Sequence, residues 1–580
     1  MERACAALNR PRCKRSHRRR CRSRLAHVWV VVIAAALLWL GLASYPLLDN
    51  NEGLYASIAK EMLSRSAWIT PHLNGVAYEE KPPLFYYVLS ILFSLFGTHE
   101  WSARAASASA ASACLAFVYW FAKSMIGRAE AQIAVLILSS SVGFVMLGRT
   151  VMPDMLLMLL FCAALLGSFI AWKRTDAKAY CASLAALAGA VLTKGLLPLA
   201  LFLLVWTLFV AATWRSTGHG AMRFLMRPVP WLLFLAVALP WHVAAAMHDP
   251  SFVWRYFVNE HVLRFFGSRI PADTYSGLPL YHLPRVVLLF FPWIALVPTA
   301  IGRRSRPAVA QLDLFLWLAV FAVVGFFTLA NAKANYYVAL ALPFASLWLV
   351  VRMYAFVADG PPRSTLVAIT VLTIALVVTT VAFLFRKNGW YALLLRANWQ
   401  ALSFATALII GTGVVAVAIV VRRLNPWLAP PLAAAVLLAF ALAAMSAIER
   451  RVSTKALFDR TVEKCSRCTL MLFRDYENMS AVGFYSNQSV VPVIDSESSD
   501  LWWGQIRTPD APAFVTSMEV SRRAWAGEPI AIVVSRFSRK AFLASPLAGQ
   551  CKLLGRRGGA SSYLLSRSTM QEPLKEAPMP

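Results

Sequence analysis

Apolar runs of about 20 residues recur along most of the chain, and they constrain the fold more than any other feature. A helix needs about 20 apolar residues to cross the hydrocarbon core of a bilayer, and such runs follow one another between residues 27 and 447. The composition agrees, because 59% of the 580 residues are hydrophobic and only 15% are charged. Soluble domains have about 45–50% apolar and about 25% charged residues. We therefore predict an α-helical polytopic membrane protein and exclude the disordered, collagen-like and disulfide-scaffold classes.

The distribution of basic residues predicts the topology. The net charge is +29, but Lys and Arg lie mainly in short loops between apolar runs, as the positive-inside rule requires, so nucleic-acid binding is the weaker explanation. The apolar run 84–97 spans only about 21 Å as a helix, whereas the hydrocarbon core is about 30 Å thick. If this run lies along the membrane, the inner loops keep most of the basic residues. We therefore predict about 13 transmembrane helices, a basic cytoplasmic tail over residues 1–25, and a periplasmic C-terminus.

Two long loops are predicted on the outer side, at 49–102 and 248–282. Apolar residues recur at helical spacing over 54–65, which predicts an amphipathic surface helix. Pro82 and Pro83 precede a second helix over 84–97, because proline suits a first helical turn. The first loop should therefore carry two juxtamembrane helices within the membrane domain, 26–447.

From residue 448 the sequence becomes more polar and gains short β-like runs. These runs are Thr469–Phe473, Val490–Ile494, Ile530–Val534 and Tyr563–Leu565. They predict a small α/β domain over 448–580, outside the membrane. Cys465 and Cys468 form a C-x-x-C pair there, for which a local disulfide and no bond are equal alternatives.

Charged and polar residues gather at the outer ends of the predicted spans, where they would converge on one cavity. Charges at that depth are costly and mark functional sites by default. Each also has a structural alternative. The alternatives are an interface lysine for Lys81, a hairpin residue for Lys194, an i,i+4 partner of Glu260 for Arg264, a helix cap for Asp154, a structural histidine for His261, an interface aromatic for Tyr337, and solvated loop acids for Asp49 and Glu52.

Several segments resemble one family of enzymes. They are Asn50–Ala56, Tyr78–Pro83, Met152–Asp154, Leu192–Gly195, Glu260–Phe265 and Lys333–Tyr337. They are similar to the GT-C class of membrane glycosyltransferases, in particular the aminoarabinose transferases that modify lipid A, relatives of the protein O-mannosyltransferases. The resemblance covers about residues 27–447. It implies thirteen spans, two juxtamembrane helices, a periplasmic C-terminal domain, and a monomer in the bacterial inner membrane.

The same resemblance implies a donor and a site. The donor would be an undecaprenyl-phosphate-linked sugar, with Lys81, Lys194, Arg264 and Tyr337 around its phosphate. Asp49, Glu52 and Asp154 would stand at the reacting centre, and Glu80 with His261 would hold a divalent metal such as zinc. The chain departs from the family at Asn51, where an aspartate is usual, and at Leu54, where an arginine is usual. Asp49 is the nearest replacement for the missing acid.

These features predict transfer of 4-amino-4-deoxy-L-arabinose, or a related sugar, to a phosphate of lipid A. A hydroxyl acceptor needs a carboxylate base, whereas a phosphate is already an anion, so the loss of the acid at Asn51 favours the phosphate. Transfer of another sugar to a protein or glycan hydroxyl is the main alternative. A lipid transporter or flippase would show mid-span charges and internal repeats. An assembly protein would not need charges clustered at span ends.

Overall fold

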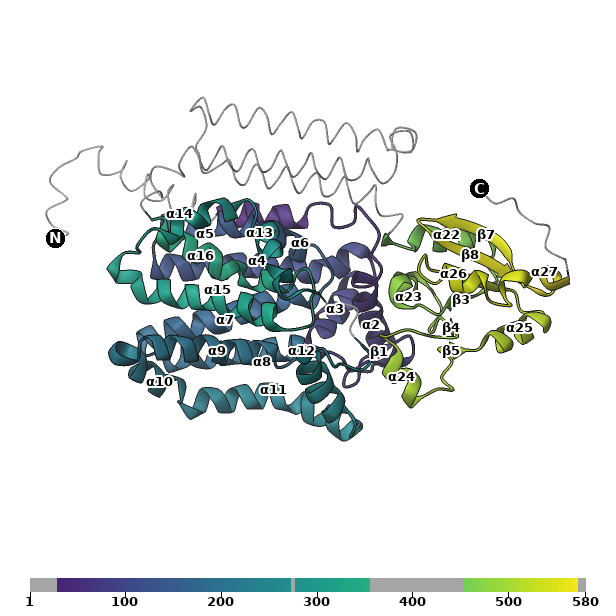
Figure 1. The fold of residues 1–580 in the computed structure, drawn as a ribbon, viewed down its shortest axis with the longest axis horizontal. Coiled ribbons are helices and arrows are strands. Elements are labelled where there is room, and N and C mark those ends of the chain that lie inside the picture. The colour runs from purple at the N-terminus through teal and green to yellow at the C-terminus, as the bar shows by residue number, and fades with distance from the viewer. Residues whose placement is uncertain (1–28, 273–276, 355–451, 572–580) are drawn as a thin grey trace, which may run out of the picture.

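The computed structural model describes residues 29–272, 277–354 and 452–571. A body of helices occupies most of the molecule, and an α/β domain lies at one end of it (Figure 1). The α-helices of the body are Trp29–Trp39, α2 (Glu52–Arg65), α3 (Leu84–Phe96), α4 (Glu100–Met125), α5 (Arg128–Ser139), α6 (Val142–Gly148), α7 (Pro153–Arg174), α8 (Ala177–Lys194), α9 (Leu197–Ala212), α10 (His219–Leu225), α11 (Pro228–His248), α12 (Arg264–Phe266), α13 (His282–Leu289), α14 (Val297–Ile301), α15 (Ala310–Leu329) and α16 (Leu342–Arg352). Its shorter elements are the strands β1 (His72–Leu73) and β2 (Val76–Ala77), the π-helices η2 (Trp214–Gly218) and η3 (Trp254–Leu263), and the 3-10 helices η4 (Pro279–Tyr281), η5 (Trp293–Leu296), η6 (Pro307–Val309) and η7 (Tyr337–Ala341).

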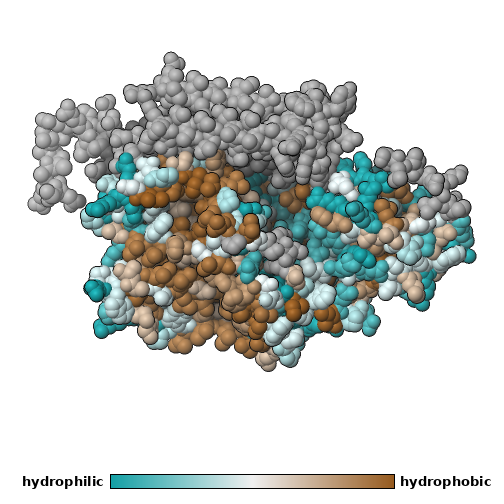
Figure 2. All heavy atoms as spheres, in the orientation of Figure 1, coloured by the Kyte–Doolittle hydropathy of each residue, from teal (hydrophilic) through white to brown (hydrophobic). Residues whose placement is uncertain are grey.

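The helical body has the length and surface of a membrane domain. Within the described ranges, four helices are long and apolar enough to cross a bilayer, and the number rises to seven if each bent helix pair is one span. The three bent pairs turn by 70°, 96° and 99°. Figure 2 shows apolar side chains over much of the visible face of this body. The tail 1–25 and the predicted spans at 365–385, 403–421 and 428–447 lie outside the described residues.

The two helices predicted in the first outer loop are present, but α2 is not a surface helix. Most of its residues are buried, on the side away from α3 as well. The C-terminal domain covers that side, and Gly53 lies so close to the backbone of Ala481 that a Cβ atom at Gly53 would overlap it. Lys60 donates hydrogen bonds to the carbonyls of Phe484 (2.8 Å) and Ser486 (2.7 Å). The apolar spacing of α2 gave no sign of this second packing partner.

The C-terminal domain is built on a mixed sheet of six strands in the order β5-β4-β3-β6-β8-β7. β3 lies parallel to both β4 and β6, while β8 is antiparallel to β6 and β7. The strands are β3 (Thr469–Phe473), β4 (Val493–Ile494), β5 (Phe514–Val515), β6 (Ile530–Val534), β7 (Lys552–Arg557) and β8 (Ala560–Leu565). The helices are α22 (Lys455–Lys464), η9 (Glu477–Met479), α23 (Ala481–Tyr485), α24 (Trp502–Arg507), α25 (Ser517–Trp525), α26 (Arg539–Leu543), η10 (Ala548–Gln550) and α27 (Arg567–Gln571). The predicted α/β character of this region is thus confirmed, and Cys465 and Cys468 form a disulfide.

Candidate functional site

A cavity of about 460 Å³ opens where the outer loops, α9 and α15 meet the C-terminal domain. Its polar walls come from segments far apart in the chain, and they include Lys81, Lys194 and Arg264 among the residues that the sequence predicted to converge. Its apolar walls come mainly from α9, α12 and α15. The lining residues include Asn50, Asn51, Tyr55, Tyr78, Glu80, Lys81, Lys194, Leu196, Leu197, Ala200, Glu260, His261, Arg264, Phe265, Phe266, Arg269, Phe326, Phe327, Tyr336, Tyr337, Ser499 and Asp500.

Three of the predicted phosphate ligands are cations, and all three line this cavity. Lys81 precedes the two prolines before α3, and its Nζ lies 5.3 Å from the centre of the Tyr55 ring. Lys194 ends α8 and lies 4.7 Å from the ring centre of Tyr337, the fourth predicted phosphate ligand. Arg264 begins α12. One cavity therefore combines cationic side chains with broad apolar walls, which is an arrangement suited to an amphiphile with an anionic head.

Two of the cations already have carboxylate partners. Lys194 Nζ lies 2.5 Å from Asp154 Oδ1, and Arg264 Nη1 lies 2.9 Å from Glu260 Oε2. The second contact is the i,i+4 pair that was the structural alternative for Arg264. Both arrangements restrain a long flexible side chain at the cavity wall, which lowers the entropy cost of binding an anion there.

His261 has a structural environment. Its Nε2 accepts a hydrogen bond from the Leu196 N–H (2.9 Å), and its Nδ1 donates to the Tyr256 carbonyl (2.6 Å). Burial lowers its pKa, so the ring is the neutral tautomer with the proton on Nδ1. Gly195 has φ +80°, and a Cβ atom there would overlap His261 Nε2. The close contact fixes the chain just after Lys194.

Glu80 and His261 are not arranged to hold the predicted metal ion. Both ring nitrogens of His261 are used by the backbone, and Glu80 Oε1 lies 2.8 Å from Arg269 Nη2. The described part of the chain contains no group of three or more His, Cys, Asp and Glu residues that could hold a metal ion. The arrangement of Glu80 and His261 is therefore explained without a metal.

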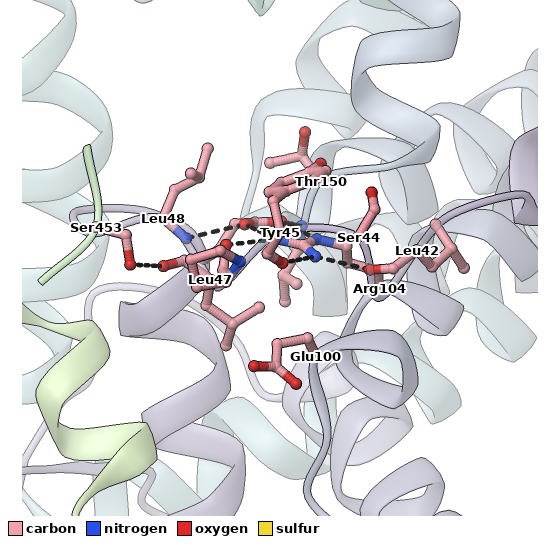
Figure 3. A network of polar contacts seen from close by, with 12 residues as sticks. Leu42, Ser44, Tyr45, Leu47, Leu48, Glu100, Arg104, Thr150 and Ser453 are labelled. Atoms are coloured by element: carbon pink, nitrogen blue, oxygen red, sulfur yellow. Dashed lines mark hydrogen bonds and ion pairs between the residues drawn. The ribbon is translucent and has the colours of Figure 1, made fainter. Parts of the chain in front are cut away.

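Glu52, which was predicted at the reacting centre, lies in the protein interior and takes part in structural contacts. The side chain is fully buried. Its Oε1 accepts from Arg104 Nε (2.9 Å) and the Val151 N–H (3.1 Å), and its Oε2 accepts from Arg104 Nη2 (2.7 Å) and the Leu48 N–H (3.0 Å). Arg104 also donates to the carbonyls of Leu42 and Tyr45, a network seen in Figure 3. Four donors occupy both carboxylate oxygens, so Glu52 holds the start of α2 against α4.

Asp49 also lies away from the cavity walls. Its Oδ1 accepts from Thr454 Oγ1 (3.1 Å) and the Ala481 N–H (3.0 Å), both in the C-terminal domain. Burial raises the pKa of Asp49 to about 8. Asp49 therefore joins the two parts of the protein, whereas Asn51 lines the cavity.

Asp154 is the predicted carboxylate that lies beside the cavity. It lines a narrow recess with Lys194, Tyr336 and Tyr337. Its Oδ1 pairs with Lys194, whereas Oδ2 has no hydrogen-bond partner among the described residues. Asp154 thus has one oxygen left for a substrate group.

Two further charged residues of the cavity were not expected. Arg269 bridges Glu80 (2.8 Å) and Glu260 (2.6 Å). Asp500 reaches the cavity from the C-terminal domain, more than 400 residues after Lys81. It lies in a polar segment with no motif, so no pattern in the sequence distinguishes it from a surface acid.

The comparisons with known proteins agree with this geometry. Residues 80–246 match the family model described as dolichyl-phosphate-mannose-protein mannosyltransferase. The chain is 30% identical over 339 residues to the undecaprenyl phosphate-alpha-4-amino-4-deoxy-L-arabinose arabinosyl transferase of Yersinia enterocolitica, covering 57% of each chain. It is 30% identical over 338 residues to the enzyme of the same name from Edwardsiella ictaluri, covering 56% of this chain and 57% of the relative. The alignments thus span little more than half the length of these relatives.

The fold matches over a longer range. The crystal structure of ArnT from Cupriavidus metallidurans bound to undecaprenyl phosphate superposes with a TM-score of 0.78 at 21% identity, covering 94% of this chain and 99% of that one. The apo form of the same protein gives a TM-score of 0.77. The chain therefore shares its fold with this ArnT structure, and residues 80–246 are similar to the dolichyl-phosphate-mannose-protein mannosyltransferase family.

Proposed function

We propose that this protein transfers 4-amino-4-deoxy-L-arabinose, or a closely related sugar, from undecaprenyl phosphate to a phosphate of lipid A. The observation that carries the proposal is the meeting of Lys81, Lys194 and Arg264 on one cavity with apolar walls. A polyprenyl phosphate has one anionic group on an apolar chain, and this cavity matches both parts. The names of the aligned relatives support the same donor and sugar.

The proposed reaction exchanges one glycosidic bond for another. An oxygen of the acceptor phosphate attacks the anomeric carbon of the sugar, and the bond from that carbon to the carrier phosphate breaks. The electron pair stays on the carrier phosphate, where Lys81 and Arg264 stabilise the developing charge. Since the attacking oxygen is already anionic, no proton has to be removed from it.

The positions of the carboxylates support a phosphate acceptor. Asp49 and Glu52 are held by hydrogen bonds away from the cavity walls. Position 51, which faces the cavity, is an amide. A site that deprotonates a hydroxyl needs a carboxylate, and position 51 does not supply one. Asp154 remains, with one oxygen committed to Lys194.

A hydroxyl acceptor is the second candidate, and the free Oδ2 of Asp154 is the observation that favours it. This oxygen would accept the proton of a protein or glycan hydroxyl. The two candidates differ in their dependence on Asp154. A base is indispensable for the hydroxyl reaction, whereas the phosphate reaction needs Asp154 only to orient Lys194.

The proposed setting is the bacterial inner membrane. About 13 spans, a cytoplasmic N-terminus and a periplasmic cavity would follow from the charge distribution of the loops. The Cys465–Cys468 disulfide supports an oxidising compartment for the C-terminal domain. We propose a monomer, since one chain supplies all the cavity residues described above.

The test uses full-length protein reconstituted in vesicles with a synthetic undecaprenyl-phosphate aminoarabinose donor. Lipid A and enzymatically dephosphorylated lipid A are offered separately, and the products are analysed by mass spectrometry. Addition of one aminopentose to lipid A alone is the expected result. Equal modification of the dephosphorylated acceptor, with complete loss in Asp154→Asn, would establish the hydroxyl candidate instead. No product with either acceptor would refute both.

A further inference from the structure

An acidic recess adjoins the cavity where the first outer loop, η3 and the C-terminal domain meet. It shares Tyr78, Glu80, Glu260 and Asp500 with the cavity wall and is completed by Ala77, Glu79, Arg255 and Trp503. The centre of a water-sized group can occupy a volume of about 10 Å³ in this recess. That is about the size of one water molecule or one ammonium group, and far less than a sugar ring needs.

Most carboxylates of the recess already have cationic partners. Glu79 pairs with Arg255, and Arg269 bridges Glu80 and Glu260. Arg507 also lies 3.4 Å from Glu79 Oε2, and Arg264 lies 2.9 Å from Glu260 Oε2.

Asp500 differs from these acids. No hydrogen bond or ion pair joins its carboxylate to any residue that the structure describes, although it lies at both the cavity and the recess. Burial and the nearby charges of Glu80 and Glu477 raise its pKa, while Lys81 and Arg269 oppose this in part. A cation beside Asp500 would therefore stabilise the ionised form of this carboxylate.

A second acid in the recess has an unused oxygen. Glu79 is only 7% exposed, and its Oε1 has no hydrogen-bond partner among the described residues. A buried carboxylate oxygen without a donor is costly. A ligand with several N–H donors would satisfy both this oxygen and Asp500, and an ammonium group has three such donors.

We propose that this recess is a subsite for a primary ammonium group of the transferred sugar, with Asp500 as its principal carboxylate. The inference rests on the proposed function, since it assigns a part of the same substrate. With Lys81 and Arg264 on the donor phosphate, the amine of the sugar would lie beside Asp500, which lines both the cavity and the recess. The C-terminal domain then selects the sugar, whereas the outer loops of the membrane domain hold the carrier.

The test compares two synthetic undecaprenyl-phosphate donors with the full-length reconstituted protein. One donor carries the free 4-amino group and the other carries the same group as a neutral formamide. We expect Asp500→Asn to lower kcat/KM for the amine donor about 10- to 100-fold, mainly through KM, and to leave the formamide donor nearly unchanged. Glu497→Gln is the matched control, because Glu497 is a nearby exposed acid that pairs with Arg474.

Each other result has a distinct meaning. Equal losses with both donors, or no loss with either, would overturn the ammonium subsite while the proposed transfer still stands. If the unsubstituted protein transfers from neither donor, the proposed function itself fails. Metal analysis of purified protein covers the remaining possibility: a divalent ion present in the unsubstituted protein and absent from Asp500→Asn would overturn the proposal. Undecaprenyl phosphate binding by Asp500→Asn shows that the variant is folded.

Discussion

Glu52 and Arg104 form a two-point ion pair in the protein interior, with Oε1 2.9 Å from Nε and Oε2 2.7 Å from Nη2. Neither side chain is exposed. Because the same arginine also binds three backbone carbonyls of the segment before Asp49, the pair fixes the entry into α2. The segment of the first outer loop around Glu52 therefore has a structural role.

Removing one member of that pair should destabilise the protein without a specific effect on chemistry. We expect Glu52→Gln to lower the free energy of unfolding by about 3–5 kcal/mol, since it leaves a buried guanidinium uncompensated. Thermal unfolding in detergent measures this loss. The double variant Glu52→Gln with Arg104→Met should lose less than the sum of the single variants. A Glu52→Gln protein of unchanged stability but without transfer activity would return Glu52 to the reacting centre.

Lys81 should determine affinity for the carrier phosphate. Replacing it by methionine keeps much of the apolar stem and removes the charge, so binding of undecaprenyl phosphate should weaken about 10-fold or more. Equilibrium binding of labelled undecaprenyl phosphate to protein in nanodiscs measures the effect. Lys552→Met, a change on exposed β7 of the C-terminal domain, serves as the control. Unchanged affinity in Lys81→Met would place the phosphate elsewhere.

Asp49 should make stability depend on pH. Its folded-state pKa is raised to about 8, so the folded protein binds a proton that the unfolded chain releases from about pH 4 upward. Stability from this group is present at low pH and is lost as the pH rises towards 8. Asp49→Asn mimics the protonated acid, and we expect it to be more stable than the parent at pH 8 and to retain transfer activity. Unfolding midpoints between pH 5 and pH 8 check the first expectation, and an inactive but stable Asp49→Asn would contradict the second.

Gly195 and His261 should behave as a coupled pair. Gly195→Ala introduces both a positive-φ penalty of about 1–2 kcal/mol and an overlap with His261, and both disturb Lys194. We expect lower stability and weaker carrier binding. His261→Ala in the same background should relieve only the overlap and so recover part of the loss. Full additivity of the two changes in thermal unfolding would show that the contact is unimportant.

The C-terminal sheet was predictable because its central strands are buried on both faces. Thr469–Phe473 and Ile530–Val534 are short apolar runs in a polar region, and both are strands with the predicted bounds. β7, with Gly555 and two arginines, has no such signal. The helix α2 was also predictable, but its burial was not, because helical periodicity reports one buried face and cannot show a second partner that is 400 residues away.

The cationic part of the site was predicted because basic residues gather at the outer ends of several predicted spans, although each also had a structural alternative. The acids were harder to assign. Glu52 and Asp49 follow a predicted span as candidate catalytic acids would, and only the positions of Arg104 and Thr454 reveal their structural roles. Asp500 could not be predicted from the local sequence, since it reaches the cavity only because the C-terminal domain packs against the helical body.

The position of Asp500 at the cavity has a consequence for how proteins of this fold diversify. An exchanged or remodelled C-terminal domain would bring its own acid, amide or hydroxyl to the cavity, while Lys81 and Lys194 of the helical body stay in place. New sugar preferences could then arise by recombination downstream of the last span, without any change in the machinery that recognises the carrier.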